Sequence, residues 1–301
     1  MKFDAIVVGG SFAGLSAAMQ LVRARKNVLM VDAGRPRNRF AATAHGFLGQ
    51  DNRRPADIRA DALAQLARYP TFTLWQDEAL KVERRIGGFR LVLAEHEVAE
   101  STVMILALGV EDTLPAIPGL AERWGRTVLH CPYCHGFEIG GGPIGILASS
   151  PLAAHQGGLL PDWGKTTMFV ESGVTFDEEH VAMLLARGVK MENERVVELL
   201  GEGYGLRGVR LADGRMVEVH ALFAQSRVAI ASPLADQLGL ELDEGPQGFH
   251  IKAEMGRTSV PGVFAAGDAA SPMHNATLAS AAGVMAGISA HRALIEAALW
   301  G

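Results

Sequence analysis

The first thirty residues show two apolar runs separated by a helical pattern of hydrophobic positions. Residues 5–8 are apolar and β-rich, which predicts a buried strand. The next apolar positions recur at helical spacing: Leu15, Ala18, Leu21 and Val22. They predict a helix that ends near Arg25, and a second apolar run ends at Asp32. The order strand, turn, helix and strand predicts a parallel βαβ unit.

The same pattern returns in the middle of the chain. Residues 143–171 repeat the order of residues 5–32, with a strand at 144–147, a helix from about Leu152 and a strand that ends at Glu171. Two such repeats predict an α/β fold built from two Rossmann-like three-layer domains, the second inserted in the first.

Three further segments complete the expected elements. Residues 55–69 have a helical pattern, and residues 72–108 have short apolar runs with a hairpin turn at Gly87 and Gly88. Near the other end, residues 263–265 predict a short buried strand, which is followed by a loop and a long helix of small residues.

The turn after the first strand carries a dinucleotide-binding fingerprint with one departure. Gly9 and Gly14 occupy the outer glycine positions, but the middle position is Ser11, which gives G-x-S-x-x-G. Backbone amides at such a helix start hold a pyrophosphate, and Asp32 can accept hydrogen bonds from a ribose. Taken alone, the match also fits an ordinary βαβ unit.

A second motif stands far from the first one. The stretch T-S-V-P-G-V-F-A-A-G-D, residues 258–268, resembles the second FAD signature of the low-molecular-weight thioredoxin reductase family. The resemblance covers nearly the whole chain and implies FAD as cofactor. It gives Asp268 the ribityl-binding role and places Asn275 and Ala276 near the flavin.

The resemblance also implies an organisation and a set of cofactor residues. The FAD domain is expected to be split over residues 1–113 and 228–301, with residues 114–227 forming the inserted NAD(P)-type domain, and the molecule is expected to be a homodimer. The predicted FAD-binding residues are Gly9, Ser11, Phe12, Ala13, Gly14, Asp32, Gly109, Gly267, Asp268, Asn275 and Ala276.

Both cysteines of the chain lie in one motif, H-C-P-Y-C-H, with Cys131 and Cys134 flanked by His130 and His135. C-P-Y-C is also the glutaredoxin tetrapeptide, but its position between two nucleotide-type folds does not fit a glutaredoxin. Covalent haem needs export, and zinc needs further ligands. No metal site is therefore predicted, and a redox dithiol is favoured.

The resemblance gives the two cysteines different roles. Cys134 is expected to face the flavin, while Cys131 exchanges with the substrate. The histidines that flank them, His130 and His135, are similar to those of the dithiol oxidases of gliotoxin and holomycin biosynthesis. Either imidazole can take a thiol proton near neutral pH, with His130 preferred as general base. The alternative is that one or both only cap or bind backbone.

The second nucleotide turn has lost its glycines. Ala148, Ser150 and Ala153 stand where bare backbone must approach a pyrophosphate. The segment after the next strand has no arginine for a 2′-phosphate and carries three acids instead: Asp177, Glu178 and Glu179. These features disfavour NADPH as a cofactor.

Composition and charge limit the classes of partner that the protein is expected to bind. The chain has 301 residues, is 49% hydrophobic and 20% charged, and has a net charge of −5, which does not indicate a nucleic-acid partner. An unbroken apolar run of about 18 residues and a signal peptide are not found, so a cytoplasmic protein without a membrane partner is expected.

The sequence thus predicts an FAD-dependent thiol–disulfide oxidoreductase that oxidises a dithiol and passes the electrons to oxygen. Its partner is expected to be a small-molecule dithiol or disulfide, or a thioredoxin-like protein. Two other hypotheses stay open: an NADPH-dependent disulfide reductase, and a non-catalytic flavoprotein that acts as a redox sensor.

Overall fold

The computed structural model describes residues 1–96 and 98–300, the last as backbone only, and divides into two compact units. Unit 1 comprises Met1–Arg39, Pro55–Glu111 and Val228–Gly301, and unit 2 comprises Phe40–Arg54 and Asp112–Arg227. The sequence-based boundaries placed residues 40–54 in the first domain. In the structure this segment clusters with unit 2.

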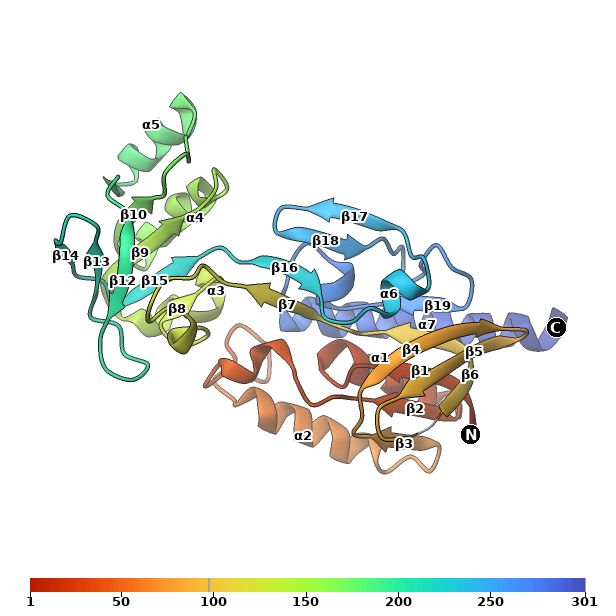
Figure 1. Cartoon of the computed structure of the whole chain (residues 1–301). Helices are drawn as coiled ribbons and strands as arrows, with labels where there is room; N and C mark the ends of the chain where they lie inside the picture. Colours follow the sequence, from red (N-terminus) through yellow and green to blue (C-terminus); the bar gives the residue numbers. More distant parts are fainter. Residues whose placement is uncertain (97, 301) are drawn as a thin grey trace. The chain divides into compact units, whose positions relative to one another are not determined.

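Unit 1 contains the two ends of the chain (Figure 1). Its helices are α1 (Phe12–Arg23), α2 (Pro55–Leu66), α6 (Leu234–Gln237) and α7 (Ala276–Trp300). Its strands are β1 (Lys2–Val8), β2 (Val28–Val31), β3 (Phe72–Trp75), β4 (Ala79–Arg85), β5 (Gly88–Leu93), β6 (Val98–Leu106), β17 (Leu242–Gly245), β18 (Gly248–Ile251) and β19 (Val263–Ala265). Strands β7 (Val110–Thr113) and β16 (Arg227–Ile230) pair where the chain passes between units.

The main sheet of unit 1 has the order β3-β2-β1-β6-β5-β4. Strands β1, β2, β3 and β6 are parallel, with β6 paired to β1 from Glu100 to Leu106, and β19 joins β6 in register, with Phe264 opposite Ile105. The first half of β6 pairs antiparallel with β5. The carboxyl ends of β1, β6 and β19 therefore meet at one edge, where open α/β sheets bind their ligands.

Helices α1 and α7 lie against each other at very short range. A Cβ atom on Gly283 would collide with the backbone oxygen of Ala13, and one on Gly287 would lie 2.7 Å from that of Ala17. Ala13 and Ala17 are themselves buried. Only glycine on α7 allows this approach, so the last helix of the chain packs directly on the first one.

Of the described helices, α7 is the one long and apolar enough to cross a membrane by length and composition, since an 18-residue window within residues 276–299 has a mean hydropathy of 1.3. The sequence analysis predicted this helix but no membrane span, because Ser, His and Arg residues interrupt the apolar positions. Its glycines contact α1, and 33% of the segment is buried. We interpret α7 as a helix that packs on unit 1.

Unit 2 contains a second parallel sheet. Its helices are α3 (Pro132–His135), α4 (Ala153–Leu159) and α5 (Glu178–Ala186). Its strands are β8 (Val128–Leu129), β9 (Gly141–Ala148), β10 (Gly164–Val170), β11 (Lys190–Glu192), β12 (Val196–Leu200), β13 (Gly208–Leu211), β14 (Met216–Val217) and β15 (Ala221–Ala224). The parallel sheet has the order β11-β10-β9-β15-β8, and β12-β13-β14 form a separate antiparallel sheet.

Each parallel sheet has a core on both of its faces, as parallel strands require. In unit 1, Ile6 and Leu106 contribute to one core, and Val7 and Ile105 contribute to the other. In unit 2, Leu147 and Ile146 divide in the same way. The predicted fold class, two Rossmann-like α/β domains, is confirmed by this structure.

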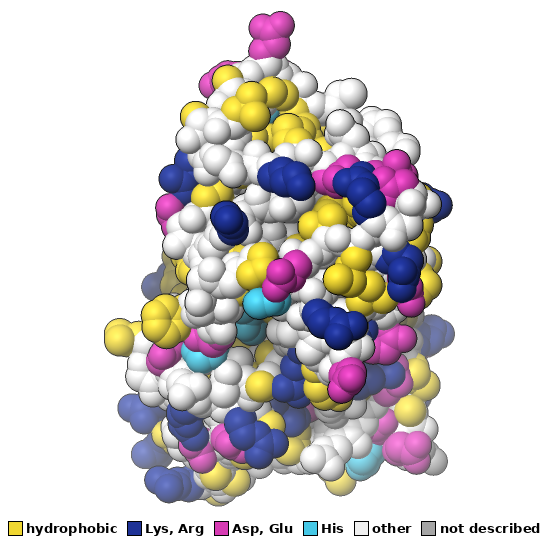
Figure 2. Space-filling view, turned by 90° about the vertical axis from the view of Figure 1, so that its left-hand side faces the viewer, with side chains coloured by type: hydrophobic (Ala, Val, Ile, Leu, Met, Phe, Trp, Pro, Cys, Tyr) yellow, Lys and Arg dark blue, Asp and Glu magenta, His cyan; other side chains and the backbone are white. Residues whose placement is uncertain are grey.

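Short 3₁₀ helices connect several of these elements. They are η1 (Arg37–Phe40), η2 (Ala121–Arg123), η3 (Phe137–Ile139), η4 (Leu160–Asp162) and η5 (Asp268–Ala270). On the surface drawn in Figure 2, basic and acidic side chains are interspersed with apolar ones. This face therefore has no broad field of one sign of the kind that attracts nucleic acid.

The short approach of α7 to α1 predicts a large effect of Gly283→Val. The added side chain must push α7 away from the backbone of Ala13, so we expect the free energy of unfolding to fall by about 1–3 kcal/mol. The control is Ala281→Val on the exposed side of the same helix, with an expected cost of about 0.7 kcal/mol or less. Equal urea midpoints for the two variants would contradict this packing.

Candidate functional site

The first glycine turn in unit 1 presents bare backbone. Gly9 has φ +106°, and a Cβ on it would collide with the carbonyl oxygen of Ala107, while one on Gly14 would collide with that of Gly9. Ser11 is the N-cap residue of α1. The predicted cofactor residues at this turn are Gly9, Ser11, Phe12, Ala13 and Gly14. The turn keeps the form that a pyrophosphate requires despite its serine.

Asp32 lies directly after β2 and is 8% exposed. Its Oδ1 accepts a hydrogen bond from the backbone N–H of Gly10 at 3.0 Å. Its Oδ2 pairs with the guanidinium of Arg59 on α2, which also donates to the carbonyl oxygen of Gly10 at 2.7 Å. Arg59 thus ties the acidic residue to the glycine turn, and the sequence analysis missed it.

The second FAD motif lies at the end of β19. Gly267 has φ +77°, and a Cβ on it would lie 2.9 Å from that of Ala13. Asp268 forms an ion pair with Arg37 at 3.3 Å, and Arg37 donates to Nδ1 of His274 at 2.7 Å. Because a guanidinium only donates, Nδ1 of His274 accepts and the ring proton lies on Nε2. Arg37 and His274 were not predicted.

The remaining cofactor predictions lie on backbone features of unit 1. Asn275 caps α7, since its Oδ1 accepts hydrogen bonds from the N–H groups of Thr277 at 2.8 Å and Leu278 at 3.3 Å. Ala276 is the first residue of that helix. Gly109 has φ +67° and follows β6. The side-chain oxygen of Asn275 is therefore engaged by its own helix.

These residues fit FAD, which the fold implies as the resident cofactor. At the turn, the carbonyl oxygens of Ala107 and Gly9 leave no room for a Cβ on Gly9 or Gly14, so both positions present bare backbone. Asp32 can bind a ribose, and Asp268 offers a second carboxylate held by Arg37. Such a site combines bare backbone amides for phosphate with acceptors for hydroxyl groups.

The dithiol motif lies in unit 2 at the start of a one-turn helix. Cys131 is the N-cap residue of α3, and the backbone N–H of Cys134 donates to its carbonyl oxygen at 3.3 Å. Both cysteines are half-buried. A Cβ on Gly136 would lie 2.7 Å from the Trp163 ring, so the turn is seated closely on that side chain. The spacing of three keeps both cysteines on one turn.

His130 is held from two sides. Its ring stacks on Trp124 with the centroids 6.0 Å apart and an angle of 29° between the planes. Its carbonyl oxygen accepts from Nε2 of Gln156 on α4 at 3.0 Å. The helix that follows the altered nucleotide turn thus supports the strand end that leads into the dithiol.

His135 faces a residue that comes from far away in the sequence. Its ring lies edge-on to that of His45, with the centroids 6.5 Å apart. Nδ1 of His45 lies 3.4 Å from a carboxylate oxygen of Glu138. Burial lowers the pKa of His135, His45 lowers it further, and Glu138 acts in the opposite direction. The neutral imidazole is therefore favoured, and it can accept a proton.

The second nucleotide turn is filled with side chains. Ala148 and Ala153 stand at the outer fingerprint positions, and both are fully buried. At the middle position Ser150 donates to the side-chain oxygen of Gln225 at 2.7 Å. The first turn excludes Cβ atoms at the outer positions and the second turn contains them, so the two folds of one repeat differ in their phosphate-binding element.

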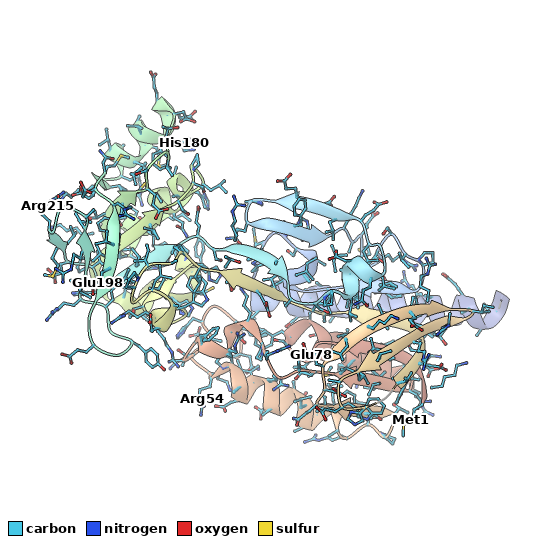
Figure 3. The ribbon with its side chains drawn as sticks, viewed as in Figure 1. Met1, Arg54, Glu78, His180, Glu198 and Arg215 are labelled. Carbon is cyan, nitrogen blue, oxygen red and sulfur yellow. The ribbon has the colours of Figure 1, made fainter. Side chains whose placement is uncertain are left out.

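The acidic cluster after β10 has a structural role of its own. Asp177 is the N-cap of α5, and its side chain accepts from the backbone N–H of His180, which is labelled in Figure 3, at 2.8 Å. This hydrogen bond lowers the pKa of Asp177. Glu178 and Glu179 lie in the first turn, where negative charge favours the helix.

Comparison with known proteins adds to this geometry. A family profile described as pyridine nucleotide-disulphide oxidoreductase matches residues 3–286. Thioredoxin reductase tcpT of Claviceps purpurea is 32% identical, over 97% of this chain and 94% of that protein. Among solved structures, an oxidoreductase from Agrobacterium tumefaciens has 46% identity and a TM-score of 0.94, covering 98% of this chain and 99% of that one.

A second solved structure, described as HlmI, is 32% identical to this chain. It has a TM-score of 0.90 and covers 99% of this chain and 94% of its own. Thioredoxin reductase sirT of Leptosphaeria maculans is 31% identical over 95% of this chain and 92% of that protein. All of these matches run along nearly the full chain, so they include both units.

The buried pair of Arg59 and Asp32 is expected to contribute more to stability than an exposed pair, and this difference can be tested. Arg59→Met leaves Oδ2 of a buried carboxylate without its partner, so we expect the free energy of unfolding to fall by about 1–3 kcal/mol. Arg35→Met removes the exposed pair of Arg35 with Glu78, the residue labelled in Figure 3, and is expected to cost less than about 1 kcal/mol. Urea unfolding of both variants measures the difference, and a larger loss for Arg35→Met would contradict the assignment.

Proposed function

Because the chain belongs to the pyridine nucleotide-disulphide oxidoreductase family and is an FAD-dependent oxidoreductase, we propose that it oxidises dithiols to disulfides with oxygen as acceptor. One observation carries this proposal. The first nucleotide turn keeps bare backbone at Gly9 and Gly14, whereas the second has methyl groups at Ala148 and Ala153 and a hydrogen-bonded Ser150 at its middle position. This difference supports a retained flavin site and the absence of a nicotinamide electron donor from the proposed reaction.

The reaction is balanced by the substrate and oxygen alone. A dithiol loses two electrons and two protons to become a disulfide, and oxygen takes both to become hydrogen peroxide. FAD, when bound in unit 1, carries the two electrons between the dithiol motif and oxygen. Glycine-turn amides, Asp32 and Asp268 would hold it.

The cysteines perform the exchange. A substrate thiolate attacks Cys131 of the Cys131–Cys134 disulfide, which forms a mixed disulfide and releases Cys134 as thiolate. The second substrate thiolate then displaces Cys131, and the substrate leaves as a disulfide. The cysteine dithiol passes two electrons onward and closes its disulfide again.

The histidines accept the protons that the substrate thiols release in this exchange. Attack requires a thiolate, so the substrate proton must go to a neighbouring base. His130 is the proposed general base, with its ring fixed on Trp124. The neutral His135, adjacent to Cys134 in the chain, can take a second proton.

The proposed substrate is a small dithiol or the dithiol of a thioredoxin-like protein. Tyr133 and Phe137 stand on either side of Cys134 in the chain and are 69% and 84% exposed, which offers apolar surface to either. We further propose a cytoplasmic homodimer. The names of the curated relatives make an NADPH-dependent disulfide reductase the second candidate.

Anaerobic reduction of the FAD-loaded enzyme separates the two candidates. We expect a small dithiol to bleach the flavin absorbance rapidly, and air to restore it with one peroxide formed for each disulfide. NADPH is expected to leave the absorbance unchanged because its turn is closed. Rapid bleaching by NADPH would instead establish a reductase.

Cys134→Ser tests the role of the dithiol. We expect this variant to retain FAD, because the residues proposed to hold it lie in unit 1, and to lose flavin bleaching by dithiols. The matched control is Tyr133→Phe, which keeps the edge-on ring contact with Trp163 and should bleach at the wild-type rate. Unchanged bleaching in Cys134→Ser would overturn the assignment of the dithiol.

A further inference from the structure

The segment Phe40–Arg54 separates from unit 1 and forms a small closed loop in unit 2. Ala44 and Arg53 form an antiparallel bridge, with the N–H of Ala44 donating to the carbonyl oxygen of Arg53 at 2.8 Å. Within this bridge the N–H of Gly46 donates to Oδ1 of Asp51 at 2.9 Å. These bonds fix the backbone on both sides of His45.

His45 is the side chain that this loop directs at the dithiol segment. Its side chain is 12% exposed. Nε2 lies 2.8 Å from the hydroxyl oxygen of Thr43, and Nδ1 lies 3.7 Å from Asp51 and 3.4 Å from Glu138. Asp51 belongs to the loop itself, but Glu138 belongs to η3, directly after α3. His45 is therefore seated between a carboxylate of its own loop and a carboxylate of the dithiol segment.

The groups near His135 come from the loop of residues 40–54 and from the dithiol segment formed by α3 and η3. His45 faces it from the loop, Glu138 follows in η3, and Cys134 precedes it in α3. His45 lowers the pKa of His135, and the carboxylate of Glu138 raises it. The two neighbours therefore act on one ring in opposite directions.

We propose that His45 is a positioning residue of the dithiol site, which together with Glu138 sets the charge of His135 and thereby keeps it ready to receive a thiol proton. This inference rests on the proposed function. The dithiol substrate releases two protons: one goes to His130, the proposed general base, and the other leaves the second substrate sulfur for a ring nitrogen of His135. The proton then leaves to solvent, and no further oxidant or reductant is required.

The coupling has a readout that does not depend on turnover. The protein is labelled with ¹³C-histidine, and the ring signals are titrated, with the signal of His135 identified by its loss in His135→Gln. We expect His45→Gln to raise the pKa of His135, because the neighbouring side chain that lowers it is removed. Glu138→Gln is expected to lower it, and the control His180→Gln on exposed α5 should leave it unchanged.

The same variants are then followed in the anaerobic reduction of the flavin by a small dithiol. The rate of flavin reduction is expected to rise with pH as His135 becomes neutral. This rise in the pH–rate profile should lie at higher pH in His45→Gln and at lower pH in Glu138→Gln. The plateau above this rise should stay at the wild-type value. This recovery at high pH distinguishes a charge effect from a damaged loop, which would lower the rate at every pH.

The outcomes separate the inference from the function on which it rests. The role of His45 is supported if the rise in rate shifts in opposite directions in the two variants and the ring titration of His135 shifts in the same directions. A wild-type enzyme whose flavin reacts with dithiol, but whose rise in rate and ring titration do not move in either variant, overturns this role alone. A wild-type flavin that no dithiol reduces overturns the proposed function, and the role of His45 in it.

Discussion

The close contact of α7 with α1 is the constraint on which the flavin-type unit depends. Gly283 and Gly287 let the last helix approach the backbone of Ala13 and Ala17, and the approach is too short for any side chain. The contact joins segments more than 250 residues apart in the chain. It holds the glycine turn after β1 and Asp268 after β19 at one edge of a single sheet, although neither half of unit 1 forms that edge alone.

The two nucleotide-type folds show how little of a Rossmann unit its topology determines. Both have a parallel sheet covered on two faces, and both have a helix after the first strand. The difference lies in a few backbone positions. In unit 1 the oxygen atoms of Ala107 and Gly9 occupy the space that a Cβ would take, whereas in unit 2 methyl groups at Ala148 and Ala153 are accommodated in the core. Fold and binding capacity are therefore separable, and function has to be argued from the site.

Local patterns predicted the elements well and the contacts between them poorly. Residues 5–8, 263–265 and the hairpin at Gly87 were recognised because strand and turn signals lie within a few residues. Arg59 and Arg37 were missed, since only the folded chain brings them to Asp32 and Asp268. An arginine-rich stretch directly after Asp32 was the one available signal for Arg37. The approach of His45 to His135 had no sequence signal, because it depends on where a long loop folds.

The loop of residues 40–54 also makes the dithiol-bearing unit discontinuous in the chain. The polypeptide passes between the units at four places, after residues 39, 54, 111 and 227. A chimaera that exchanges only residues 112–227 with a relative would combine one protein's cysteine helix with another protein's His45 loop. Recombination within this family therefore has two segments to transfer together, residues 40–54 and residues 112–227, because both belong to the compact unit that carries the cysteines.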